Sequence, residues 1–305
     1  MKNIINYYYN LNLLNLYEIG NKYCFTIDNN DYVFMIYNRP IDDAPLLYNL
    51  NIGLKERRIM VNDIITNKDN QIITLVNNIP YVLIRNTLRT KSITMNDLLY
   101  IQNNTINING DKKLYRTDWI KMWSDKIDYY ENEISHSARK YKLLSEVIDF
   151  YIGLGENAIE YLVDNNFEIN DICLSHKRID INKGSFDFYN PVNFIFDSRV
   201  RDFAEYIKNL FFYEKINFEI LQNYLNYINF TRNEYILFVS RMLFPTNFFD
   251  QVDLILEGKC DEISLKKIVD KTSQYIAFVK NIFIYIIYNK RINIPIIEWI
   301  LKKTD

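Results

Sequence analysis

The sequence predicts an α+β protein in two parts: a small antiparallel β-sheet with one helix in residues 1–85, and a larger, mainly helical part in residues 86–305. The 305 residues are too many for one hydrophobic core of usual size. The first part favours strands, whereas apolar residues in the second recur at the spacing of amphipathic helices. These observations indicate two lobes of different secondary structure.

Two hairpins make up the predicted sheet. Four β-rich runs form them: residues 23–27, 32–37, 71–76 and 79–84. Their connections, residues 28–31 and 77–78, consist of Asn and Asp, which tolerate the tight turn that a hairpin demands. Between the hairpins, residues 46–67 favour a helix, although Gly53 weakens that pattern.

Helices dominate the second part. A stripe of apolar residues at helical spacing predicts the first one: Trp119, Trp123, Ile127, Tyr130 and Ile134. Residues 137–164 predict another helix, and residues 167–197 predict short strands and loops. Helices resume at Val200, with breaks near Pro245, Gly258 and Pro295. A small sheet lobe, a short crossover and a large helical lobe are the layout of the protein-kinase-like fold, which the sequence therefore predicts.

Charge, cysteine content and hydropathy exclude several classes of protein. The net charge is −2 and no long basic run occurs, so we expect no nucleic-acid partner. Cys24, Cys173 and Cys260 are odd in number and far apart, which disfavours a disulfide framework and indicates a reducing compartment. Residues 1–17 lack the features of a signal peptide, and the most apolar later stretch, residues 282–288, is much shorter than the roughly 20 residues of a membrane span. We expect a soluble chain made in the cytoplasm, with no membrane span.

Four segments resemble one protein family. Residues 197–206, Asp197-Ser198-Arg199-Val200-Arg201-Asp202-Phe203-Ala204-Glu205-Tyr206, resemble the stretch after the metal-binding loop in spore-coat proteins of the CotS type, most closely the YutH branch. Three further segments fit in the same order: residues 119–130, 151–161 and 240–250. The front lobe fits in layout only. These coat proteins belong to the aminoglycoside-phosphotransferase and choline-kinase superfamily. The resemblance implies a location in the spore coat or at the spore surface, with other coat proteins as partners.

Phosphoryl transfer needs a glycine-rich loop over the phosphates, a lysine to neutralise them, an Asp base, and an Asn and an Asp that hold magnesium. The segment for the glycine loop, residues 18–23, has a single Gly, so no backbone cradle is indicated. The lysine belongs on the third strand, but Arg39 is the only cation between Tyr23 and Leu54. Arg39 cannot be assumed to replace the phosphate-binding lysine, because a rigid guanidinium fork and a compact ammonium reach differently. We expect Arg39 to be a surface or loop residue.

The resemblance places the catalytic loop at His176, the structural histidine of the family. The base position then holds Arg178, which stays protonated and cannot accept a proton. The magnesium-binding Asn falls near Lys183, and a one-residue slip would bring in Asn182. The second metal ligand falls on Asn193, which is neutral and binds magnesium more weakly than a carboxylate. The sequence thus predicts no intact catalytic residue at His176, Arg178 or Asn193.

Other constellations are weaker. Cys173 and His176 have a Cys-x-x-His spacing, but two histidines and three cysteines hardly complete a zinc site, so we expect no metal. Arg199, Arg201 and Asp202 form a charged cluster that is either an anion site or a structural brace. We favour the brace, because an Asp near a helix N-terminus is stabilising by itself.

Three functions therefore compete. The first is a catalytically inactive pseudokinase of the spore coat that binds other proteins and needs no cofactor. The second is an active small-molecule phosphotransferase with a rearranged site, using Asp180 or Asp187 together with ATP and magnesium. The third is a pseudokinase that still binds nucleotide. Turnover of ATP separates the second from the others, and a thermal shift with ATP separates the third from the first.

Overall fold

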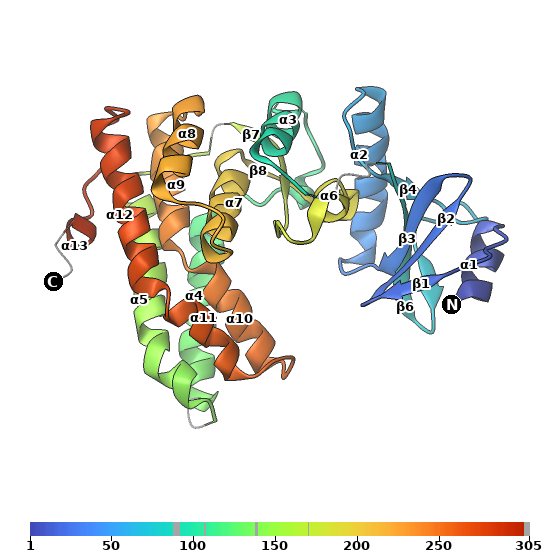
Figure 1. Ribbon diagram of the computed structural model, residues 1–305, viewed down its shortest axis with the longest axis horizontal. Coiled ribbons are helices and arrows are strands. Elements are labelled where there is room, and N and C mark those ends of the chain that lie inside the picture. Colours follow the sequence, from blue (N-terminus) through green and yellow to red (C-terminus); the bar gives the residue numbers. More distant parts are fainter. Residues whose placement is uncertain (88–91, 107, 138–139, 170, 302–305) are drawn as a thin grey trace. The chain divides into compact units, whose positions relative to one another are not determined.

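The computed structural model describes residues 1–87, 92–106, 108–137, 140–169 and 171–301 (Figure 1). They form two compact units, each built from two stretches of chain. The first unit combines Met1–Arg116 with Ile172–Asp197, and the second combines Thr117–Asp171 with Ser198–Asp305. The boundary between lobes at residue 85 stays a prediction.

An antiparallel sheet organises the first unit. Its strands are β1 (Tyr17–Ile19), β2 (Lys22–Ile27), β3 (Asn30–Ile36), β4 (Asp63–Ile65), β5 (Thr74–Val76) and β6 (Ile79–Asn86). The order is β1-β2-β3-β6-β4, and β5 also pairs with β6. Both predicted hairpins, β2–β3 and β5–β6, are confirmed. Asp28, Asn29, Asn77 and Asn78 all have positive φ, as tight hairpin turns require.

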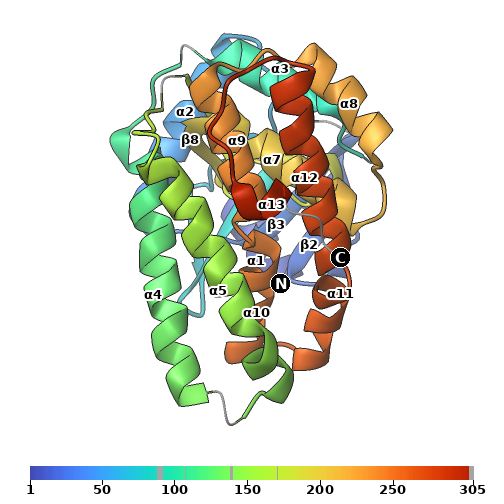
Figure 2. The same ribbon diagram turned by 90° about the vertical axis from the view of Figure 1, so that its left-hand side faces the viewer.

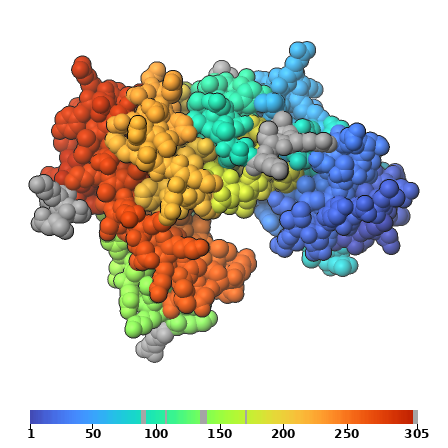
Figure 3. All heavy atoms as spheres, in the orientation of Figure 1, coloured from blue at the N-terminus to red at the C-terminus, as the bar shows by residue number. Residues whose placement is uncertain are grey.

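One face of the sheet carries the hydrophobic core of the strands. Phe25, Phe34 and Leu83 pack there with Ile5 of helix α1 (Lys2–Tyr9) and with Leu13. The sequence analysis missed α1, which has no side-chain cap at its N-terminus. The N-terminal residues lie at the surface of this unit, in dark blue in Figure 3.

The helix expected over residues 46–67 is shorter in the structure. Helix α2 spans Ala44–Glu56, and Arg58, just beyond it, has a φ of 59° that no helix continues. Part of the remaining stretch forms β4 instead. The unit also contains α3 (Met95–Thr105) and α6 (Gly184–Phe188), with 3₁₀ turns at Ile41–Asp43, Lys112–Leu114 and Pro191–Asn193.

Two short strands close the first unit. β7 (Ile172–His176) pairs with β8 (Phe194–Ser198), as expected for residues 167–197. Phe196 on β8 is fully buried, bridges to Tyr115 and stacks on its ring with a centroid separation of 5.1 Å. A Cβ at Gly110 would lie only 2.0 Å from the Phe196 ring, so this approach needs glycine.

The second unit is helical. Its elements are α4 (Trp119–Ser137), α5 (Lys142–Val163), α7 (Val200–Phe212), α8 (Phe218–Tyr227), α9 (Arg232–Leu243), α10 (Thr246–Leu256), a 3₁₀ turn (Glu262–Leu265), α11 (Lys266–Val269), α12 (Thr272–Tyr288) and α13 (Glu298–Leu301). The expected breaks at Pro245, Gly258 and Pro295 are confirmed. Helix α5 packs against α4 and α9, and Figure 2 shows α4 and α5 side by side. Four residues of the predicted stripe on α4 are buried, namely Trp119, Trp123, Ile127 and Tyr130, and Trp123 stacks on Phe244 at 4.4 Å.

Among the described residues, no helix is both long enough and apolar enough to cross a membrane.

Candidate functional site

A polar cavity of about 240 Å³ lies in the first unit, between the sheet and the loop after β7. Its lining consists of Lys22, Met35, Asn38, Ile93, Arg178, Ile179, Asp180, Lys183, Asp187, Phe188 and Asn193. Four of these residues were candidates from the sequence: Arg178, Asp180, Asp187 and Asn193. Three cations and two carboxylates meet here, so the cavity has an excess of positive charge.

Lys22 was not foreseen as part of this site. It begins β2 and lies opposite Met35 of β3, which lines the same cavity. Its Nζ donates to Oδ1 of Asp187 at 2.9 Å and to Oδ2 at 3.2 Å. The third strand, β3, contains no lysine, as the sequence indicates. The ammonium comes from the second strand, whereas the sequence analysis searched for it on the third.

The segment expected to hold the glycine loop is a tight turn. Ile19 and Lys22 pair directly, so Gly20 and Asn21 alone connect β1 to β2. Gly20 has a φ of +57°, the left-handed conformation that glycine adopts readily. A two-residue turn offers few backbone N–H groups for a phosphate.

His176 is buried at the end of β7, with 1% of its surface exposed. Its Nε2 donates to the carbonyl oxygen of Phe188 at 2.7 Å, and its ring stacks on the Phe188 ring at 4.3 Å. The Phe194 ring meets it edge-on at 5.4 Å. These contacts anchor the end of α6 to β7, and they fit the structural role that the resemblance implies for this histidine.

Cations surround the start of the loop after β7. Arg178 is exposed, lines the cavity and donates to the carbonyl of Lys177 at 3.2 Å. Partial burial lowers the pKa of Lys177, and the charges of Arg39, Arg116 and Arg178 lower that pKa further. A positive potential therefore prevails where a catalytic base would have to accept a proton.

Arg39 lies in the loop after β3, as expected, but it is not a surface residue. Its side chain is 4% exposed and forms an ion pair with Asp43 at 3.1 Å. The guanidinium also donates to the carbonyl oxygens of Val192 at 3.1 Å and Phe194 at 2.8 Å. Arg39 thus ties the loop after β3 to the start of β8.

The two Asn candidates lie in different surroundings. Asn193 lines the cavity, and its Nδ2 donates to the backbone oxygen of Asp187 at 2.9 Å. Asn182 is not part of the lining, and its backbone N–H donates to Oδ1 of Asp180 at 3.0 Å. Asp180 therefore serves a local turn while facing the cavity, and only Asn193 remains near Asp187.

These residues do not fit a magnesium ion. Within the part of the chain that the structure describes, no group of three or more His, Cys, Asp or Glu side chains could hold a metal. Both carboxylate oxygens of Asp187 face Lys22, and Asn193 presents its amide nitrogen, not its oxygen, to the Asp187 backbone. Asp197, to which the sequence analysis assigned no catalytic role, is fully buried on β8 and does not line the cavity.

The charged cluster at the start of α7 belongs to the second unit. Arg199 binds both carboxylate oxygens of Glu234 and the carbonyl of Asn229. Arg201 is buried over the ring of Trp119, 4.7 Å from its centroid. Asp202 is 2% exposed in the first turn of α7. The two arginines therefore bind different partners, and the preference for a brace over an anion site stays a prediction.

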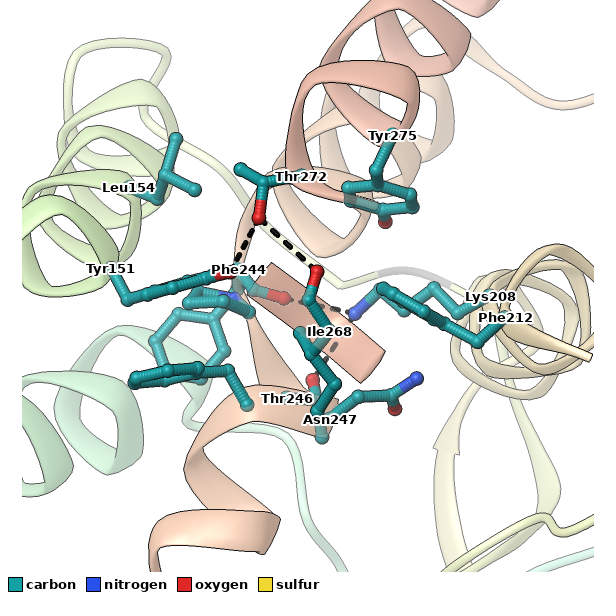
Figure 4. Close-up of a pocket in the computed structure, with 12 residues that line it drawn as sticks. Tyr151, Leu154, Lys208, Phe212, Phe244, Thr246, Asn247, Ile268, Thr272 and Tyr275 are labelled. Atoms are coloured by element: carbon teal, nitrogen blue, oxygen red, sulfur yellow. Dashed lines mark hydrogen bonds between the residues drawn. The ribbon is translucent and has the colours of Figure 1, made fainter. Parts of the chain in front are cut away.

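A second cavity, in the second unit, is nearly filled (Figure 4). Its volume is about 20 Å³, room for a single water molecule. Lys208 points into it, and its Nζ donates to the carbonyl of Phe244 at 3.0 Å and to Oγ1 of Thr246 at 3.1 Å. Burial lowers the pKa of Lys208, and Glu205 at 3.3 Å opposes that shift. These contacts make Lys208 a structural residue.

The structure has the two-lobed kinase-like fold of the aminoglycoside phosphotransferases. It is similar to an aminoglycoside phosphotransferase from Alicyclobacillus acidocaldarius subsp. acidocaldarius DSM 446, with a TM-score of 0.63 and 11% identity over 90% of this chain and 92% of that one. A microcompartment-associated aminopropanol kinase is similar with a TM-score of 0.60 and 10% identity, over 95% of this chain and 98% of that one. A spectinomycin phosphotransferase bound to AMP is similar with a TM-score of 0.58 and 10% identity, over 92% of this chain and 93% of that one. Identities this low establish the fold alone.

The sequence defines the particular family. Residues 2–282 match the model of the family described as "Spore coat putative kinase YutH", and the chain belongs to this family. It is 27% identical over 154 residues to the endospore coat-associated protein YutH of Bacillus subtilis (strain 168). That alignment spans 44% of this chain and 45% of the relative, less than half of its length. The resemblance noted from the four sequence segments is confirmed.

Proposed function

We propose that this chain is a non-catalytic, kinase-like protein of the spore coat that acts by binding other coat proteins. Membership of the YutH family and the coat-associated relative support the location in the coat or at the spore surface, after synthesis in the cytoplasm. The fold supplies a large, two-part scaffold, and fold by itself does not establish activity.

The arrangement around Asp187 carries the proposal that no phosphate is transferred. Lys22 neutralises the carboxylate of Asp187, one of the two acids that line the cavity. Arg178 lines the cavity at the position that the family resemblance assigns to the catalytic base, and a guanidinium cannot accept the proton of an acceptor hydroxyl. Loss of parts that act as one unit removes most of a reaction rate, because their effects are not independent.

Turnover of ATP by the purified protein tests this proposal. We expect no magnesium-dependent release or transfer of the γ-phosphate with amino alcohols or aminoglycosides as acceptors. Three acids serve as controls, through the variants Asp180→Asn, Asp187→Asn and Asp197→Asn. Turnover by the wild type that any one of these variants abolishes would establish the active phosphotransferase instead.

Spores provide the test of the coat function. Deletion of the gene should remove or mislocalise other coat proteins, as measured by mass spectrometry of coat extracts. The same three acid-to-amide variants, expressed from the native locus, should restore a normal coat, because binding does not require a catalytic acid. Failure of all three to restore it, at normal protein levels, would contradict a purely binding role.

Nucleotide binding without transfer is the second candidate, and the excess of cations in the cavity favours it over the active enzyme. Lys22, Arg178 and Lys183 would attract an anionic ligand. A thermal shift at millimolar ATP, present without magnesium and lost in Lys22→Ala, would support this candidate. No shift is expected if the chain acts by protein binding alone.

A further inference from the structure

The Lys22–Asp187 ion pair crosses the polar cavity and joins β2 to α6. We propose that the ammonium group of Lys22 is the permanent counter-ion of Asp187 and excludes divalent metal ions from the cavity. This inference rests on the proposed absence of phosphate transfer and adds a role for one residue in it.

The ammonium engages Asp187 as a metal ion would. Nζ lies 2.9 Å and 3.2 Å from the two carboxylate oxygens, so the ammonium contacts both of them and neutralises the charge that would attract another cation. The ring of Phe186 lies 4.9 Å from Nζ and adds a cation–π contact. The side chains of Lys22 and Asp187 are 30% and 18% exposed, so salt screens their attraction less than that of a surface pair.

Asp187 is presented by a rigid segment. Three successive carbonyl oxygens of α6 each accept a side-chain hydrogen bond: Phe186 from Asn62 at 3.1 Å, Asp187 from Asn193 at 2.9 Å, and Phe188 from His176 at 2.7 Å. His176 stands at the position that the family resemblance assigns to the catalytic loop, and Asn193 stands at the position that it assigns to the second metal ligand. Here they fix the backbone that carries the Asp187 carboxylate.

Lys22 is fixed in a comparable way. Its backbone pairs with Ile19 of β1 on one side and with Met35 of β3 on the other, so it lies inside the sheet and not at its edge. Its side chain therefore starts from a fixed point and only its own rotamers remain free. A preorganised ammonium and a preorganised carboxylate give up little conformational entropy when they pair.

Removal of Lys22 should convert the cavity into a weak site for divalent cations. Asp187 and Asp180 would then face a cavity whose lining also includes Asn38 and Asn193, and rotation of either amide could offer its oxygen. Carboxylate and amide oxygens are the ligands that calcium, magnesium and manganese prefer. With Lys22 present, a divalent ion would meet a third fixed cation beside Arg178 and Lys183, and repulsion at a few ångströms disfavours its entry.

Binding of Mn²⁺ to the full-length protein tests this role. Wild type, Lys22→Gln and Lys22→Gln/Asp187→Asn are compared by calorimetric titration with MnCl₂ and by thermal unfolding with and without it. Lys22→Gln should have a lower Tm than the wild type, and Mn²⁺ should restore part of the lost Tm. It should also bind Mn²⁺ at least about tenfold more tightly than the wild type, which corresponds to about 1.4 kcal/mol in binding free energy. The double variant should lose this gain. Lys121→Gln, which removes one partner of the exposed Lys121–Asp125 pair, is the matched control and should behave like the wild type.

Two results would overturn the role: wild type and Lys22→Gln that bind Mn²⁺ equally well, or a gain that persists in the double variant. If Lys22→Gln does not fold, the charge-swapped variant Lys22→Asp/Asp187→Lys takes its place. This variant should fold and bind no Mn²⁺. Tight binding of Mn²⁺ by the charge-swapped variant would contradict the proposal. ATP turnover by the wild type would overturn the proposed function, whereas equal Mn²⁺ affinities without turnover overturn only the counter-ion role.

Discussion

Two ion pairs with the same i, i+4 spacing differ sharply in burial. Arg39 and Asp43 have side chains that are 4% and 12% exposed, and the guanidinium also serves two backbone carbonyls. Lys121 and Asp125 on α4 are 67% and 62% exposed. Breaking a buried pair leaves an uncompensated charge, whereas exposed pairs contribute little.

Substitution of Arg39 should therefore destabilise the protein strongly. Arg39→Met keeps the aliphatic stem but strands the carboxylate of Asp43 and the carbonyls of Val192 and Phe194. We expect a loss of about 3 kcal/mol in the free energy of unfolding. Lys121→Met, the matched control, should leave the urea midpoint unchanged. Equal midpoints for both variants would show that the buried guanidinium is not a structural tie.

The roles of residues whose contacts lie far away in the sequence were the hardest to predict. Arg39 follows a strand and precedes Pro40, a setting typical of an exposed loop, and its burial depends on carbonyls more than 150 positions away. Lys22 and Asp187 are 165 positions apart, and nothing local marks either one as a partner of the other. By contrast, Arg178 followed from its position after His176, and the structure does place it at the cavity.

Elements with local signals were predicted well. The turns at 28–31 and 77–78 carry Asn and Asp at positions of positive φ, so both hairpins were visible in the sequence. Helix α1 has no cap, and β4 is three residues long, so each lacks the local signal that would reveal it. Tertiary packing on the sheet determines both elements.

Two glycines of the first unit should respond in opposite ways to alanine. Gly110→Ala would place a Cβ 2.0 Å from the fully buried Phe196 ring, and we expect a loss of about 1–3 kcal/mol in stability, as for overpacked cores. Gly53 lies inside α2 with nothing within 4 Å of its Cβ position, so Gly53→Ala should gain up to about 1 kcal/mol from helix propensity. Thermal unfolding of the two variants measures both effects, and a Gly110→Ala protein as stable as the wild type would rule out the tight packing against β8.

At the scale of the whole molecule, the chain does not divide at one point. The first unit ends at Arg116 but is completed by residues 172–197, which bring β7, α6 and β8. The spacing of apolar residues changes from strand-like to helical after residue 85, and the boundary between lobes predicted there rests on that change. Periodicity reports local conformation, and it carries no information on which distant stretch completes a core.

Fragments of the chain test how the first unit is completed. Residues 1–85 lack the partners of buried groups: Asn62 bonds to Tyr189 and Phe186, and Arg39 bonds to Phe194. We therefore expect this fragment to show poor amide dispersion by NMR and no cooperative urea transition. A chain in which residues 1–116 and 172–197 are joined by a Gly/Ser linker of about 12 residues, which spans roughly 20 Å, should fold with one transition. The opposite outcome is a 1–85 fragment that unfolds cooperatively and a joined chain that does not fold. That result would place the structural boundary at residue 85, because the sheet and α2 would then be stable without the hydrogen bonds from β8 and α6.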